Sequence, residues 1–409
     1  MPLTDRPHGE ESPVTDATPD EFRPTALTPP STCALGWQPS ALAPVFWGWR
    51  EYGPADTAPT RVRVFHPSID PTPNTAELLS GCGKYPLIVF AHGYCEQDTN
   101  HYQRWFRTPA ALARSGYIVA VPELPDIHVH PAQSPGTQQV LANTVTWMRQ
   151  GWPGKAVLLP AAKTGLAGHS YGALHAGILA TRIQVAAVAS LGGVWNDWQP
   201  GYGTKPIHQG TVPRLLAWGV DDPQATLDAL SWNPIPKPKH RAIYGGAEHY
   251  DYFPYSQNLP CRTSSGTCPH VGIATDDLLV MFFGNYLPPE LWPDLPGRIP
   301  NNLTPPTLNL TPEQGFYAGG HLTGLSTFNA TSSCSVSLSV ELPLDKTVPH
   351  VRELPRPQAD QAVRAAGLVP VFTGSTSSSA WVASQSPAGG TNVVAESTVS
   401  MTMQTGPIP

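Results

Sequence analysis

Charged residues are scarce in this chain of 409 residues, at 13%, about half the share of an average globular protein. The formal net charge is −6 and no cluster of Lys or Arg stands out, so the sequence lacks the basic patch that is typical of a nucleic-acid-binding protein. No apolar run reaches the roughly 18 residues that a membrane-spanning helix needs. The six cysteines lack Cys-x-x-Cys spacing. The sequence therefore predicts no nucleic-acid partner, no membrane span, and no metal or other cofactor.

A secretory leader is also not visible. Residues 1–30 are polar, acidic and rich in proline, without the charged-then-apolar order of a signal peptide. Either the protein stays inside the cell or its leader has been removed. Cys261 and Cys268 bracket a Ser/Gly/Thr loop, and their spacing is compatible both with a small disulfide loop and with two free thiols.

Proline, in contrast, is abundant, at 48 residues in the whole chain, and unevenly distributed, with concentrations in the first 75 positions and in 288–306. Such stretches exclude helices and central strands. We therefore predict a proline-rich N-terminal segment at 1–44 and a Pro/Thr/Ser-rich linker with short strands at 288–346. Between them, residues 45–287 alternate short apolar runs with amphipathic stretches, which predicts an α/β domain with a mostly parallel sheet flanked by helices.

The expected elements of that domain follow from hydrophobic periodicity. The predicted strands are 61–65, 85–91, 117–121, 165–168, 185–191, 214–218 and 241–244. The predicted helices are 102–115, 137–149, 172–181 and 276–286.

A candidate nucleophile lies at Ser170, within Gly168-His169-Ser170-Tyr171-Gly172. Apolar residues precede this Gly-x-Ser-x-Gly motif and a helix-forming run follows it. A nucleophilic serine on a sharp strand-to-helix turn requires that arrangement, because the flanking glycines allow close backbone approach.

Serine needs a base, and the base needs an orienting carboxylate. An apolar strand ends in Gly-x-x-Asp at Asp222, which we favour as the acid over its neighbour Asp221. The next predicted strand runs into a turn of small residues that ends in His249, the expected base. Two other histidines of this region, His208 and His240, lie in proline-flanked segments and are expected to be solvated.

The oxyanion of an acyl transfer needs two backbone N–H donors. Tyr171 follows the nucleophile and supplies one. The other is expected from Tyr94, in the His-Gly-Tyr turn after the 85–91 strand, where His92 is predicted to be structural. His128 and His130 have a spacing that offers two imidazoles to a metal, but no third ligand is near, so a loop rim is favoured.

With these motifs, residues 45–287 resemble the α/β-hydrolase family, in particular the esterase branch of cutinase-like polyester hydrolases, platelet-activating-factor acetylhydrolases and dienelactone-hydrolase relatives. In the polyester hydrolases, a Tyr after the oxyanion glycine and a Trp on a later loop clamp an aromatic acyl group. Tyr94 and Trp195 match those positions and Trp198 is close by, so the resemblance implies substrate binding by these tryptophans. Tyr171 departs from the usual Met and implies a narrower cleft.

The C-terminal residues 347–409 resemble a PASTA domain, the small βαββ module of bacterial penicillin-binding proteins and receptor kinases. The residues that carry the resemblance are Val348-Pro349-His350-Val351, Ala365-Ala366-Gly367-Leu368, the run 382–390 and Ser397-Thr398-Val399. A short helix is predicted at 358–367. Glu353 stands where the family usually has Gly. The resemblance implies contact with peptidoglycan and favours a secreted or wall-associated location.

Three functions are compatible with these features. The first is a serine-dependent carboxylic-ester hydrolase that forms an acyl-enzyme, with aromatic or polymeric esters among its candidate substrates. The second is a non-catalytic binding protein of the cell wall that has a hydrolase scaffold. The third is an acyltransferase that uses the same three residues. An intact Ser-Asp-His order favours the first.

Overall fold

The computed structural model describes residues 46–68, 77–80, 83–94, 101–125, 127, 135–193, 195, 212–222, 232, 235–251, 271–289, 308–309, 335–341, 346–393 and 397–406. The predicted segment 1–44, the pair Cys261 and Cys268, and the pair His128 and His130 lie outside these residues. Within the described ranges, none of the helices has both the length and the apolar character that a bilayer crossing demands.

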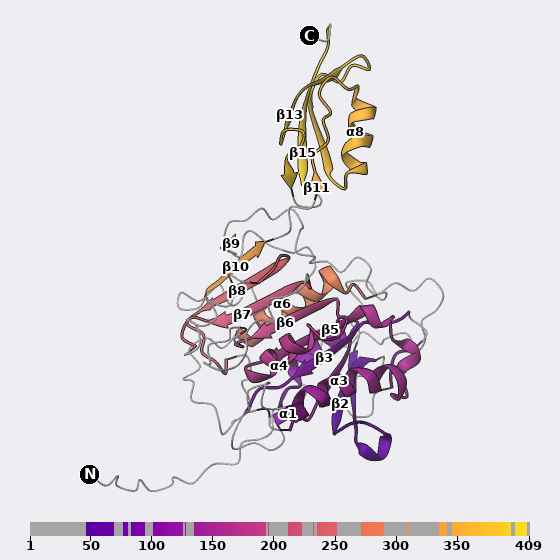
Figure 1. Cartoon of the computed structure of the whole chain (residues 1–409), viewed down its shortest axis with the longest axis vertical. Helices are drawn as coiled ribbons and strands as arrows, with labels where there is room; N and C mark the ends of the chain where they lie inside the picture. The colour runs from indigo at the N-terminus through magenta and orange to yellow at the C-terminus, as the bar shows by residue number, and fades with distance from the viewer. Residues whose placement is uncertain are drawn as a thin grey trace, which may run out of the picture.

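The larger unit is built on one ten-stranded sheet of order β1-β2-β4-β3-β5-β6-β7-β8-β10-β9 (Figure 1). The six neighbouring strands from β4 to β8 pair in parallel, and the pairs at both edges are antiparallel. The bounds are β1 Phe46–Tyr52, β2 Val62–Ser68, β3 Leu87–Ala91, β4 Ile118–Pro122, β5 Thr164–His169, β6 Ala187–Leu191, β7 Arg214–Gly219, β8 Lys239–Gly245, β9 Leu308–Asn309 and β10 Ser335–Glu341. The predicted mostly parallel α/β sheet is thereby confirmed.

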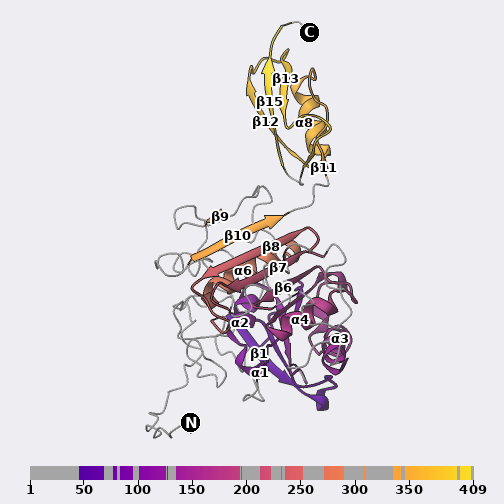
Figure 2. The same ribbon diagram turned by 60° about the vertical axis from the view of Figure 1, so that its left-hand side comes forward.

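Helices cover both faces of this sheet, because alternate residues of the central strands point to opposite sides. Ile88 and Phe90 of β3 pack in one core cluster with α2 (Arg107–Arg114) and α6 (Val271–Tyr286). Leu87 and Val89 pack in another with α3 (Pro135–Gln150) and α4 (Tyr171–Leu179), and Figure 2 shows these two helices on the same side of the sheet. Short turns of 3-10 helix lie at Pro54–Asp56, Lys155–Val157 and Ala161–Lys163.

The helix predicted at 102–115 is interrupted. The structure has α1 at His101–Arg104 and α2 at Arg107–Arg114, with Trp105 and Phe106 between them. The cause is Pro109, which has no N–H to donate to the carbonyl of residue 105 and whose ring would clash with it. The turn between the helices places the Trp105 ring in the core, at 1% exposure.

The sheet also continues beyond the predicted end of the domain. β10 lies within the segment 288–346 that the sequence predicts as a linker, and it pairs antiparallel with all of β8, from Ser335 opposite Gly245 to Glu341 opposite Lys239. The alternation of Ser with Val and Leu in the sequence of β10 is the period-two pattern of an antiparallel strand. This part of the predicted linker therefore belongs to the sheet.

The prediction that His240 is solvated is wrong. His240 lies in β8, is 3% exposed, and its Nε2 lies 2.6 Å from the Tyr286 hydroxyl of α6. Burial lowers the pKa of His240 to about 3 from its ordinary 6.5. Pro238 directly precedes β8, which begins at Lys239. The nearby proline therefore marks the start of a strand here, and not a loop.

This burial predicts an acid-sensitive fold. Between pH 6.5 and about pH 3 the unfolded chain binds a proton at His240 that the folded chain does not, so stability falls as the pH is lowered through this window. At pH 5 the loss should be about 2 kcal/mol relative to pH 7. His240→Gln keeps a polar partner for Tyr286 without titrating, and should flatten this dependence in urea unfolding midpoints measured at pH 7 and pH 5. Equal pH dependence of both proteins would contradict the prediction.

The C-terminal module, yellow in Figure 1, has its own core of Val348, Val351, Val363, Val399 and Met401 among others. Its strands are β11 Lys346–Thr347, β12 Val369–Gly374, β13 Trp381–Ser386, β14 Asn392–Val393 and β15 Thr398–Gln404, and its helix α8 spans Arg356–Ala365. The helix ends at Ala365, and Gly367, predicted as its terminating glycine, follows the cap residue with a left-handed φ of 73°. Glu353 also has a positive φ, 68°, which explains why a glycine is usual at that position.

Candidate active site

The strand β5 and the helix α4 meet at Ser170, which adopts φ 54° and ψ −126°. A positive φ in a serine is strained, and such strain is typical of functional turns. The turn is held by the Ser170 N–H, which donates to the Leu191 carbonyl of β6 at 3.0 Å. The hydroxyl thus stands at the carboxyl end of the parallel strands, where sites of open α/β sheets lie.

Both glycines of the motif are required by close contacts. A Cβ on Gly172 would lie 2.2 Å from the carbonyl oxygens of Ala91 and His92, at the end of β3. A Cβ on Gly168 would lie 2.6 Å from the backbone of Gly172 itself. These contacts bring the start of α4 directly against the turn that follows β3, which the sequence predicts as the second half of the oxyanion site.

The structure brings together the three residues that the sequence singles out. The Ser170 hydroxyl lies 2.9 Å from Nε2 of His249, and Nδ1 of His249 lies 2.8 Å from Oδ2 of Asp222. A carboxylate oxygen only accepts, so Nδ1 carries the hydrogen and Nε2 offers its lone pair to the serine. The Asp222 side chain is fully buried and that of His249 is 12% exposed. Asp221, the alternative acid, is exposed.

The loops that carry the acid and the base are packed against each other. The Asp221 N–H donates to the Ala247 carbonyl at 3.0 Å, and a Cβ on Gly219 would lie 2.0 Å from the same oxygen. Glycine at 219 is therefore needed for the β7 and β8 turns to approach. The Tyr250 ring stands edge-on to His249 at 4.9 Å, and burial together with the Asp222 charge raises the pKa of Tyr250, which keeps this phenol neutral.

The predicted oxyanion residues lie in turns that meet at the serine, since a Cβ on Gly93, directly before Tyr94, would lie 3.2 Å from Cβ of Ser170. Tyr171 is the first residue of α4, so its N–H has no acceptor within the helix. Tyr94 follows Gly93 in the turn after β3 and is half-buried. His92, predicted to be structural, is 4% exposed; its Nδ1 lies 2.7 Å from the Gly93 carbonyl, and its Nε2 accepts the Leu124 N–H at 3.1 Å. The imidazole thus ties this turn to the loop after β4.

Trp195, predicted to bind substrate, is a core residue in the structure. Trp195 is 1% exposed, its indole N–H donates to the Ala173 carbonyl of α4 at 2.9 Å, and a Cβ on Gly177 would lie 2.6 Å from its Nε1. The ring therefore packs under α4 as a core residue, in a space that Gly177 provides. Trp198, like His208, lies outside the described residues.

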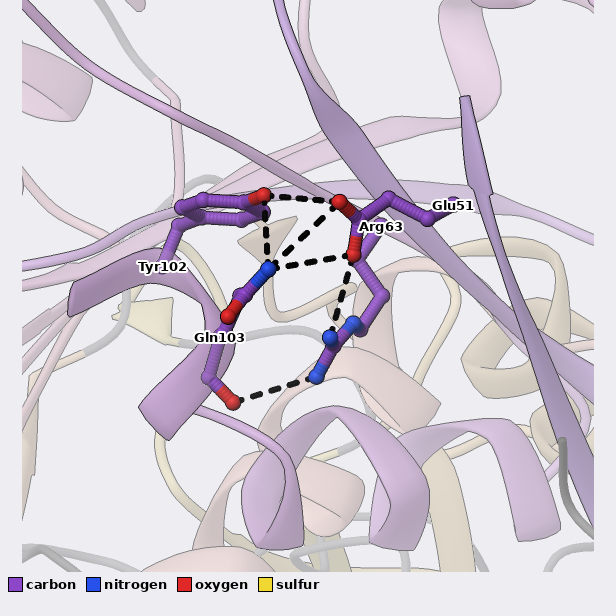
Figure 3. A network of polar contacts seen from close by, with 4 residues as sticks. All are labelled: Glu51, Arg63, Tyr102 and Gln103. Atoms are coloured by element: carbon purple, nitrogen blue, oxygen red, sulfur yellow. Dashed lines mark hydrogen bonds and ion pairs between the residues drawn. The ribbon is translucent and has the colours of Figure 1, made fainter. Parts of the chain in front are cut away.

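A network of polar side chains anchors the segment that follows the oxyanion turn (Figure 3). Glu51 of β1 accepts hydrogen bonds from the Tyr102 hydroxyl at 2.9 Å, from Arg63 of β2 at 3.1 Å, and from the Gln103 amide. Arg63 also donates to the Gln103 carbonyl at 3.2 Å. Figure 3 shows how the carboxylate lies between α1 and the β1–β2 hairpin. Because Glu51 holds both, the edge hairpin positions α1 just after the turn.

Two buried groups of the site have no signal in the sequence. Asp251 is 1% exposed and its Oδ2 accepts the Glu248 N–H at 2.8 Å, which closes the turn that carries His249. His169, the variable residue before the nucleophile, bonds the His249 carbonyl. Neither belongs to a motif with a fixed spacing. Among the described residues no group of three potential metal ligands gathers.

Comparison with known families agrees with this architecture. The model of the Chlorophyllase family matches residues 52–216, and the PASTA domain model matches residues 346–405. No curated protein matches the chain significantly. The two matches confirm both resemblances: a hydrolase of the α/β-hydrolase type, followed by a PASTA domain. The first match includes Ser170 and ends before Asp222, so the acid and the base rest on the geometry given above.

Proposed function

We propose that this protein is a carboxylic-ester hydrolase that works through an acyl-enzyme on Ser170. The observation that carries the proposal is the continuous chain from Asp222 through His249 to Ser170, with contacts of 2.8 and 2.9 Å. Contacts of this length are within hydrogen-bond reach for proton transfer. The strained turn at Ser170 supports the same interpretation, since it presents the hydroxyl rather than burying it.

In the first half of the reaction, Nε2 of His249 accepts the Ser170 proton as Oγ attacks the ester carbonyl carbon. The buried Asp222 carboxylate stabilises the imidazolium that forms and holds its tautomer. The carbonyl oxygen becomes an oxyanion, to which the N–H groups of Tyr94 and Tyr171 would donate. The C–O bond to the alcohol then breaks, and His249 returns its proton to the departing alkoxide.

In the second half, His249 takes a proton from water, whose oxygen attacks the acyl carbon. Collapse of this second tetrahedral intermediate releases the carboxylic acid and restores the Ser170 hydroxyl with the proton from His249. If an alcohol took the place of water, the same residues would perform acyl transfer. Product analysis with added alcohol acceptors separates these two outcomes.

Aromatic and polymeric esters are the narrower candidates for the acyl group. Tyr94 and Tyr171 carry the two proposed oxyanion donors, and aromatic residues at these two positions favour a flat acyl group. The Trp195 ring is buried under α4, so it does not contact the acyl group opposite a tyrosine, as the tryptophan of the polyester hydrolases does. A panel of p-nitrophenyl esters of increasing chain length, with a benzoate and a soluble aromatic polyester oligomer, would define this preference.

The PASTA domain favours contact with the cell wall, which would bring the hydrolase to esters at that surface. A purely binding function, without catalysis, is the competing proposal. Sedimentation with purified peptidoglycan, compared between the whole chain and a chain lacking residues 347–409, tests the contact. Ester hydrolysis by the shortened chain tests whether catalysis is separate from it.

The direct test of the proposed function is labelling with a fluorophosphonate probe. The Ser170 oxygen should displace fluoride and form a stable phosphonyl ester, detected by mass spectrometry on the peptide that contains residue 170. Ser115 offers a matched control, since its hydroxyl donates only to the Ala111 carbonyl of its own helix region, and Ser115→Ala should label like the wild type. Labelling at any other serine, or none, would contradict the proposal.

A further inference from the structure

His169 is a completely buried histidine at the centre of the site that takes no part in the proton transfers described above. It ends β5 and immediately precedes Ser170, and its exposure is 0%. A polar ring at such a position costs free energy unless it is hydrogen-bonded. The contacts of the His169 ring therefore indicate its role in the site.

The first contact joins it to the base. Nε2 of His169 lies 2.8 Å from the backbone carbonyl oxygen of His249. A carbonyl only accepts, so this nitrogen carries the hydrogen and donates it. The two imidazole rings are also in contact, with centroids 4.8 Å apart, and the centroid of the Trp105 ring lies 5.2 Å from that of His169.

The second contact joins it to the oxyanion turn. A Cβ on Gly93 would lie 2.6 Å from Nδ1 of His169, so the imidazole occupies the space that glycine leaves open. Gly93 directly precedes Tyr94, the candidate oxyanion donor. The single residue His169 therefore connects three separate parts of the site. Its backbone leads into the nucleophile turn, its ring contacts the oxyanion turn, and its Nε2–H contacts the His249 turn.

We propose, on the basis of the proposed function, that His169 is a positioning residue that fixes the His249 backbone relative to Ser170 through its Nε2–H donated to the His249 carbonyl. The Asp222 contact sets the rotation of the His249 ring, and the Asp251 contact closes the turn that carries it. The His169 bond alone joins the His249 backbone, among the contacts described above, to the residue next to the nucleophile, and it does so from β5, a central strand with neighbours on both sides. A displacement of about 1 Å at such a base can lower a rate by about 100-fold.

Two substitutions separate the hydrogen bond from the packing. His169→Phe keeps a ring of similar size but has no N–H, and leaves the partly buried His249 carbonyl without this donor. We expect kcat to fall by about 10- to 100-fold, with KM changed less than about threefold. His169→Gln places an amide N–H where Nε2 stands and should restore kcat to within about fivefold of the wild type.

The matched control is His66 of β2, separated from β5 by β4 and β3. It is also a buried histidine, with Nδ1 3.1 Å from the Pro67 carbonyl. His66→Phe should affect thermal stability without lowering kcat. A wild-type kcat in His169→Phe, or equal losses in the Phe and Gln variants, would overturn the positioning role. Failure of the proposed function would appear differently, as hydrolysis that survives loss of the Ser170 hydroxyl.

Discussion

Replacing Ser170 by Ala should lower kcat for p-nitrophenyl ester hydrolysis by a factor of about 10⁶. The hydroxyl oxygen is the atom that forms the acyl-enzyme, so its removal leaves only catalysis by the oxyanion donors and by binding. Alanine tolerates the φ of 54° no worse than serine does, and the Ser170 N–H bond to Leu191 is a backbone contact that the substitution keeps. The thermal unfolding midpoint should therefore change by less than a few degrees.

The same loss is expected for His249→Ala, and the double variant should be no slower than either single one. Ser170 and His249 act as one unit through their 2.9 Å contact, so the second substitution removes nothing further. Steady-state rates of the three variants at equal protein concentration give the comparison. Effects that multiply in the double variant would mean that the two residues work in separate steps, against the proposed mechanism.

The parts of the site that the sequence predicts are those fixed by local pattern. A strand, a Gly-x-Ser-x-Gly turn and a helix determine the position of Ser170 within a few residues. Asp222 and His249 could be placed because the carboxyl ends of neighbouring parallel strands meet at one edge of a sheet. Both expectations need only the order of strands along the chain.

The parts that the sequence does not predict depend on which segments meet in space. β10 pairs with β8 across about 90 residues, and its Ser-rich composition resembles that of a loop. Trp195 follows the end of a strand, as a substrate-binding residue would. Its ring is nevertheless buried, because Gly177 on α4 has no side chain and leaves space for the indole. His169 takes its role from the carbonyl group of His249, which lies 80 residues further along the chain. Hydrophobic pattern carries no information on such contacts.

Asp222→Asn should lower kcat by a factor of about 10⁴ while the structure of the site is kept. The amide has the shape of the carboxylate but no charge, so it cannot stabilise the His249 imidazolium. It can also present its NH₂ group to Nδ1, which then accepts, and the hydrogen moves to Nε2. In that tautomer Nε2 no longer accepts the Ser170 proton. Measured kcat should fall far more than KM changes.

The neighbouring Asp221 provides the matched control for this substitution. It carries the same charge one residue away, its side chain is exposed, and its contact with Ala247 uses the backbone N–H alone. Asp221→Asn should therefore keep kcat within about twofold, since an exposed charge is screened by solvent. The reverse outcome, a large loss in Asp221→Asn and a small one in Asp222→Asn, would assign the acid to Asp221. The 2.8 Å contact between Asp222 and Nδ1 of His249, made by a fully buried carboxylate, argues for Asp222.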